Sequence, residues 1–309
     1  AATGKKLVFT GGTYKFSAIS VPAGVDIEGD SFFGTVLIHS GLTGNAITLN
    51  SASQLRNLTV TRSGTPTAGS SVAIEGNKCS IQNVQFTNYF VAVTAGTTGI
   101  LVISPTIENC NFFSPVIATG SGGIFLQNYA NALVCNNTLS GPSAGTQPDW
   151  GIRAHNGDTA YLTDNNVTLH GNALLMDVPV SLNNYAMRIS GSLFDSAGVI
   201  TSTTVVSSAN ISPSGNVKDM LVVNTWFGLS TNANGLSVTT AGSGTVDGLF
   251  LSNCQFVSNG GAGVSFLGAN VINFTVHGGY VSANTVYGVR VGAGVGQFLL
   301  NGVTAGNVG

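Results

Sequence analysis

The stretch IENCNFFS, from Ile107 to Ser114, carries the pattern that decides the fold. Asn109 stands two positions after an apolar residue and three positions before an aromatic residue, Phe112. The pattern recurs at intervals of 24 to 33 residues, and its central position is occupied in turn by Asn57, Asn83, Asn109, Asn136, Asn166, Gly191, Asn224, Asn253, His277 and Asn301. A repeat of this length, with insertions, indicates an architecture of stacked units.

The segments between these positions are strand-like. NAITLNS (45–51), GGIFLQN (122–128) and GLFLSN (248–253) are short, alternating and bounded by Gly, Asn or Ser. No segment has the period of an amphipathic helix of ten or more residues. Each repeat therefore accommodates three short strands and three turns, which is one coil of a parallel β-helix. We predict an all-β fold: a single-stranded right-handed parallel β-helix, or solenoid, of about eleven coils, with residues 1–309 as one domain.

The asparagine and the aromatic residue of the pattern have separate expected roles. Strands of successive coils lie about 4.8 Å apart, so equivalent residues stack. Asparagine tolerates left-handed backbone geometry at a turn, and its side-chain amide is expected to bond the coils on either side. The residue three positions later is Phe in five coils and is expected to point inward. Each buried Phe contributes roughly 1.5–3 kcal/mol to stability.

The composition excludes several classes of protein. Only 7 % of the 309 residues are charged, and the mean hydropathy is positive. No apolar run approaches the roughly 18 residues of a membrane-spanning helix, so we expect no membrane insertion. The net charge is −2 and the ten basic residues are dispersed. Without a basic patch, we expect no nucleic-acid partner.

The cysteines and the chain ends indicate how the protein is made. Cys110 and Cys254 each follow a repeated asparagine, so both are expected to point into one interior column as free thiols, together with buried Cys79 and Cys135. Free thiols favour folding in a reducing bacterial cytoplasm. The start, AATGKKLVFT, has no signal-peptide core, and FLLNGVTAGNVG ends in mid-coil. We therefore expect a fragment of a longer protein that continues past Gly309.

The opening of the chain resembles the first coils of the pectate-lyase-like superfamily. The matching segments are GGTYKF (Gly11–Phe16) and VPAGVDIEGD (Val21–Asp30), although Thr10–Gly11 replaces the usual proline. The likeness is close over the first 60 residues, after which the coil pattern continues. The resemblance implies a phage tailspike or tail-fibre protein of the virion tail, a homotrimer at full length. Such a protein recognises, and in some cases hydrolyses, bacterial surface polysaccharide.

One segment concentrates charge in a chain that otherwise has little. TQPDWGIRAHNGDTAYLTDNN (146–166) contains Asp149, Trp150, Arg153, His155 and Asp158. Alignment of GGIFLQN, DWGIRAHN and NALLMDV places Gln127, His155 and Asp177 in one outward-facing column on successive coils. We predict that His155 and Asp177 are neighbours.

Hydrolysis of a glycan needs two carboxylates, about 5–5.5 Å apart in a retaining enzyme and about 6.5–9.5 Å apart in an inverting one. We predict Asp149, Asp158 and Asp177 as acid and base. Arg153 and His155 are expected to position the glycan, and Trp150 to offer a flat face to a sugar ring. Two alternatives remain open: a polysaccharide lyase in which Arg153 neutralises a uronate, and a non-catalytic fibre or adhesin that only binds glycan or acts as a structural shaft. The calcium ligands of pectate lyases are not recognisable, and we expect neither metal nor cofactor.

Overall fold

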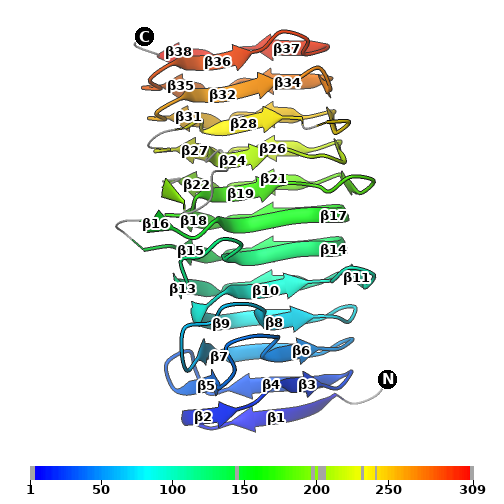
Figure 1. Cartoon of the computed structure of the whole chain (residues 1–309), viewed down its shortest axis with the longest axis vertical. Helices are drawn as coiled ribbons and strands as arrows, with labels where there is room; N and C mark the ends of the chain where they lie inside the picture. Colours follow the sequence, from blue (N-terminus) through cyan, green and yellow to red (C-terminus); the bar gives the residue numbers. More distant parts are fainter. Residues whose placement is uncertain are drawn as a thin grey trace.

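The computed structural model describes residues 4–142, 146–195, 199–200, 207–230, 233–240 and 242–306. These residues contain strands and no helix, and the strands stack in parallel along one axis to form a solenoid (Figure 1). The predicted all-β, right-handed parallel β-helix is confirmed, with close to the predicted number of coils.

The strands form three long ladders and one short ladder. The first ladder is β1 (Lys5–Phe9), β4 (Val25–Gly29), β7 (Gln54–Arg62), β9 (Ser80–Tyr89), β12 (Thr106–Glu108), β14 (Gly122–Cys135), β17 (Trp150–Thr163), β21 (Arg188–Ser190), β26 (Leu221–Val223), β30 (Phe250–Ser252), β34 (Phe274–His277) and β37 (Phe298–Asn301). The second ladder shares β7 and β9 and adds β2 (Gly12–Phe16), β5 (Thr35–His39), β13 (Asn111–Pro115), β15 (Thr138–Ser140), β18 (Asn166–Thr168), β22 (Leu193–Asp195), β27 (Trp226–Gly228), β31 (Gln255–Val257), β35 (Tyr280–Ser282) and β38 (Thr304–Gly306).

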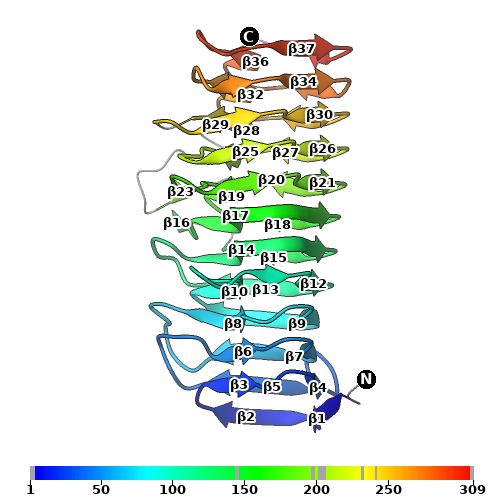
Figure 2. The ribbon, with the colours of Figure 1, turned by 90° about the vertical axis from the view of Figure 1, so that its right-hand side faces the viewer.

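The third ladder shares β14 and β17 and adds β3 (Ile19–Val21), β6 (Ile47–Leu49), β8 (Ser70–Ile74), β10 (Val91–Ala95), β19 (Asn172–Met176), β24 (Ser207–Ile211), β28 (Leu236–Thr239), β32 (Ala262–Leu267) and β36 (Tyr287–Val291). The short ladder at one corner is β11 (Val102–Ile103), β14, β17, β20 (Asn183–Tyr185), β25 (Asn216–Lys218), β29 (Thr245–Asp247) and β33 (Val271–Ile272). Outside these ladders, β16 (Thr146–Gln147) pairs with β23 (Val199–Ile200), to one side of the stack in Figure 2.

The predicted column of phenylalanines lies inside the solenoid. Its members are Phe86, Phe112, Phe194, Phe227 and Phe256, all buried. The Phe227 ring stacks on Phe194 and on Phe256, with ring centroids 5.6 Å and 5.3 Å away. All four cysteines are free and buried, as expected. Burial raises the pKa of the Cys110 thiol to about 12, so this thiol stays protonated.

The repeated asparagine occupies a left-handed turn, as predicted. Asn57, Asn83, Asn109, Asn136, Asn224 and Asn253 have φ between 49° and 56°. Three positions predicted for this turn were wrong: the register gives it to Asp164, Gly278 and Gly302 in place of Asn166, His277 and Asn301. The short polar runs at these sites allow a shift of one or two residues, and only the backbone conformation resolves it.

The predicted amide ladder is displaced by one residue. Most of the turn asparagines are exposed, although Asn83 Nδ2 does donate to Asn57 Oδ1 (3.3 Å). The buried amides belong to the residues that follow the turn. Asn137 Nδ2 donates to Asn165 Oδ1 at 3.0 Å, and both side chains are 1 % exposed. A turn asparagine is therefore favoured mainly by its tolerance of positive φ. Where an asparagine follows the turn, as at Asn137 and Asn165, that neighbour supplies the bond between coils.

Candidate functional site

Two neighbouring coils lack a connection that the coils beside them have. β14 and β17 each run without interruption for 14 residues around the corner of the solenoid. On one side, a connection of residues 96–101 separates β10 from β11, and on the other, residues 177–182 separate β19 from β20. The two long strands thus form a floor between two raised connections.

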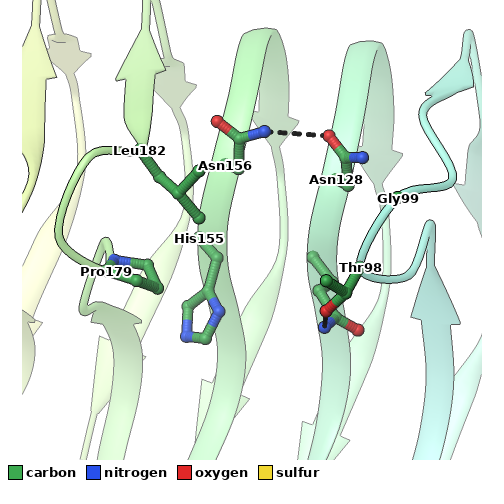
Figure 3. Close-up of a pocket in the computed structure, with 8 residues that line it drawn as sticks. Thr98, Gly99, Asn128, His155, Asn156, Pro179 and Leu182 are labelled. Atoms are coloured by element: carbon green, nitrogen blue, oxygen red, sulfur yellow. Dashed lines mark hydrogen bonds between the residues drawn. The ribbon is translucent and has the colours of Figure 1, made fainter.

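A hollow of about 140 Å³ lies on this floor (Figure 3). Thr98 and Gly99 line it from the first connection, and Pro179 and Leu182 from the second. The remaining lining residues, all from β14 and β17, are Gln127, Asn128, His155 and Asn156. The walls are small or apolar, and the floor carries amide and imidazole groups that can bond a polar ligand.

A second hollow, of about 300 Å³, adjoins the first at Asn128 and Asn156, which line both. Its other lining residues are Leu101, Tyr129, Ala130, Gly157, Asp158, Asn183 and Tyr185. Together the two hollows form one groove, called here the transverse groove. β14 and β17 run across the long axis of the solenoid (Figures 1 and 2), so the groove that follows them crosses this axis too.

A second asparagine column runs through this groove, and the repeat pattern around Asn109 does not reveal it. Asn156 Nδ2 donates to Asn128 Oδ1, and Asn216 Nδ2 to Asn183 Oδ1, both at 2.9 Å. The backbone N–H of Asn183 donates to Asn156 Oδ1 at 3.3 Å. The four residues are one coil apart in the register, so a search for further asparagines at the coil period would have found them.

Arg153, His155 and Asp177 form a charged cluster at one end of the groove. Arg153 binds Asp177 through two bonds, with Nε 2.9 Å from Oδ1 and Nη2 bonded to Oδ2. His155 Nε2 lies 2.9 Å from the same Oδ1. The predicted alignment is confirmed, since β14, β17 and β19 pair in the register that brings Gln127, His155 and Asp177 together.

The ionisation of Asp177 follows from these partners. Burial alone would raise the pKa of its carboxyl group, but the bonds and charges of His155 and Arg153 outweigh burial and lower the pKa below its ordinary value. Asp177 is therefore ionised at neutral pH. In this state it can orient His155 or accept a proton, but it cannot serve as a general acid.

Aromatic side chains pack against the charged cluster. The Phe125 ring centroid is 5.1 Å from Arg153 Cζ, and the His155 ring meets Phe125 edge-on at 4.7 Å between centroids. Trp150 is 1 % exposed and belongs to a small apolar cluster outside the main core, so it does not offer the open sugar-binding face that we predicted. Its indole lies over Gly122, where an added Cβ would come within 2.2 Å of the ring.

The three predicted catalytic aspartates do not converge. Asp149 accepts a bond from the backbone N–H of Gly120 (2.6 Å) at the start of β17. Asp177 stands opposite His155, six residues beyond Asp149, so about 20 Å of strand separates the two aspartates. Asp158 is exposed in the second hollow, where the Thr159 hydroxyl donates to its Oδ1 at 3.1 Å. Asp158 thus lines the groove, Asp177 lies beside His155 at one end of it, and Asp149 lies outside it.

Metal ligands and membrane-spanning helices can be assessed in the part of the chain that the structure describes. Within it, no group of three or more His, Cys, Asp or Glu side chains is arranged to hold a metal ion. The same residues include no helix that is long and apolar enough to cross a bilayer.

Comparison with known proteins identifies similar structures. No protein-family model and no curated protein matches the sequence. An exopolygalacturonase from Thermotoga maritima has a TM-score of 0.65 at 10 % identity, over 98 % of this chain and 84 % of the other. The surface adhesin PfbA of Streptococcus pneumoniae gives 0.60 at 11 % (98 % and 85 %), and the A-module of an Azotobacter vinelandii mannuronan C-5 epimerase gives 0.58 at 14 % (99 % and 88 %). At such identities, the likeness establishes the shared parallel β-helix fold.

Proposed function

We propose that this protein recognises a polysaccharide in the transverse groove. The observation that carries the proposal is the groove itself, which is open, elongated and floored by amide side chains between two raised connections. Amides donate to and accept from hydroxyl groups, which are the dominant groups of a glycan. Two of the similar structures are named as enzymes acting on polysaccharides and the third is an adhesin, which supports a glycan ligand.

The biological setting is part of the same proposal. The likeness of the opening coils to the pectate-lyase-like superfamily supports a receptor-binding protein of the tailspike type. The protein would then belong to a phage virion tail, form a homotrimer at full length, and recognise bacterial surface polysaccharide. The low charge and the many uncharged polar residues are compatible with such a rod.

Binding is tested by filling the groove. Thr98 is exposed on one wall, so Thr98→Trp places a large ring in the first hollow without entering the core. Thr43 is also exposed but lies coils away, and Thr43→Trp is the matched control. On an array of capsule and O-antigen polysaccharides, we expect Thr98→Trp to bind at least about 10-fold more weakly than wild type. Equal binding by the two variants would place the site elsewhere.

Cleavage of the bound glycan is a second candidate function, favoured by the pairing of His155 with Asp177 at the groove. A carboxylate orients a histidine that transfers protons near neutral pH. Asp158 lies three residues beyond His155 on β17, so at most about 11 Å of backbone separates it from Asp177. A lyase is less favoured because Arg153 is already bound to Asp177 through two bonds.

Release of reducing ends from the bound polysaccharide separates the two candidates. If His155 and Asp177 transfer protons, Asp177→Asn should lower the rate about 10²–10⁴-fold while the glycan still binds. Equal release by wild type and variant would remove Asp177 from the mechanism. Binding by wild type without any shortening of the polymer would show a binding protein.

A further inference from the structure

The charges that line the transverse groove are unbalanced. Among the described residues that line its two hollows, Asp158 is the one carboxylate, and none is Lys or Arg. We propose, on the premise that the groove binds glycan, that it selects polysaccharides whose sugar in the second hollow is uncharged. Asp158 is then the residue that rejects acidic sugars such as uronates.

The cations outside the two hollows do not line the groove. Lys218 stands in the column of Asp158 two coils on, about 10 Å away between backbones and beyond Tyr185. Arg153 lies five residues before Asp158 on β17 and directs both of its bonds to Asp177. His155 also turns Nε2 toward Asp177. An acidic sugar in the second hollow would therefore bring its negative charge beside Asp158, at a place where none of the described lining residues is Lys or Arg. The repulsion between the sugar carboxylate and Asp158 would weaken binding of an acidic polysaccharide relative to a neutral one.

Asp158 also has a favourable role toward a neutral sugar. One of its oxygens accepts a bond from Thr159, and no described Lys, Arg or His lies within ion-pair distance of it. Its carboxylate can therefore accept bonds from sugar hydroxyls, and such charge-assisted bonds are stronger than neutral ones. Tyr185, Asn183 and Leu101 enclose the same hollow and supply polar and apolar contacts.

The groove's direction makes this selection specific to one position of the polymer. Asp158 is three residues beyond His155 on β17, at most about 10 Å along the strand. A glycan that follows the two long strands thus crosses the rod, and it places one unit beside His155 and a later unit beside Asp158. An acidic sugar should be rejected at the second place and tolerated where the chain leaves the groove.

The test compares acidic bacterial polysaccharides with their carboxyl-reduced forms, which keep the backbone and lose the charge. Dissociation constants are measured at low ionic strength for wild type, Asp158→Asn and, as a matched loss of charge outside the groove, Asp26→Asn. We expect wild type to prefer the reduced forms, and Asp158→Asn to shrink that preference about 5-fold, the effect of one close like-charge pair in water. Asp26→Asn should keep the wild-type preference.

Each outcome decides a separate question. Equal affinity of wild type for acidic and reduced forms, or an unchanged preference in Asp158→Asn, overturns the selection while glycan binding stands. If wild type binds no polysaccharide on the array, the proposed function fails and the selection with it. Asp158→Glu retains the charge and should retain the preference, so its loss of the preference would also overturn the selection, even if Asp158→Asn folds poorly.

Discussion

His170 provides the sharpest test of the packing inside the solenoid. The ring is fully buried after β18, close to Gly151 of β17, and its Nδ1 donates to the Thr168 carbonyl oxygen at 2.7 Å. Burial lowers the pKa of His170 from 6.5 to about 4, although the bond to Thr168 acts in the opposite direction. The folded protein therefore holds this imidazole in its neutral form down to acidic pH.

The sign of the pH dependence follows from this difference. Between pH 6.5 and about 4 the unfolded chain binds a proton at His170 and the folded chain does not, so stability falls as the pH falls. From about pH 7.5 to about pH 4.5 the loss amounts to about 2.5 kcal/mol in the free energy of unfolding. His170→Asn leaves a cavity and costs stability, but by an amount that does not depend on pH.

Denaturant unfolding of wild type and His170→Asn at the two pH values measures the effect. Subtracting the two proteins at each pH cancels the titration of the carboxylates that they share. We expect the stability advantage of wild type over the variant to shrink by about 2.5 kcal/mol at the lower pH. An advantage that stays constant between the two pH values would refute the reasoning that His170 is buried in its neutral form.

Substitutions at three other positions test the fold. Phe227→Ala, between two stacked rings, should lower the free energy of unfolding by about 3–5 kcal/mol, and a loss below about 1 kcal/mol would contradict the packed column. Asn109 has a φ of 54°, which valine adopts poorly and glycine adopts readily. In denaturant unfolding, Asn109→Val should lower the free energy of unfolding by about 1–2 kcal/mol and Asn109→Gly by almost nothing. Equal losses would rule out backbone conformation as the cause. Gly122→Ala should push the Trp150 indole from its place and lower the free energy of unfolding by about 1–3 kcal/mol. The displaced indole should also change the near-ultraviolet circular dichroism, so an unchanged spectrum would argue against the contact.

The fold could be predicted because the repeat fixes which residues stack. One coil period accounts for the phenylalanine column, and it also accounts for the buried thiols Cys110 and Cys254. The register at Asn166, His277 and Asn301 could not be predicted from polar pattern alone, because each lies in a polar run with several candidates for the turn. The turn is set by the left-handed backbone, which apolar periodicity does not report.

The candidate site was predictable only where it depends on strand register. Alignment of strands brought His155 beside Asp177 because both belong to regular, paired coils. The burial of Trp150 depends on the absence of a side chain at Gly122 one coil earlier, and pattern matching does not weigh that absence. The walls of the groove come from two irregular connections, 96–101 and 177–182, whose shape no periodicity encodes.

The uninterrupted course of β14 and β17 has a consequence for how ligand preference can change. Strands hold the rod together, whereas the lengths of the connections beside β14 and β17 determine where the transverse groove lies. A few residues inserted after Gln127 or Asn156 would close the transverse groove. Shortening the segment 96–101 would widen the groove by one coil. New carbohydrate specificities are thus open to this scaffold through insertions and deletions at its corners, without any change in the rings that stack at its centre.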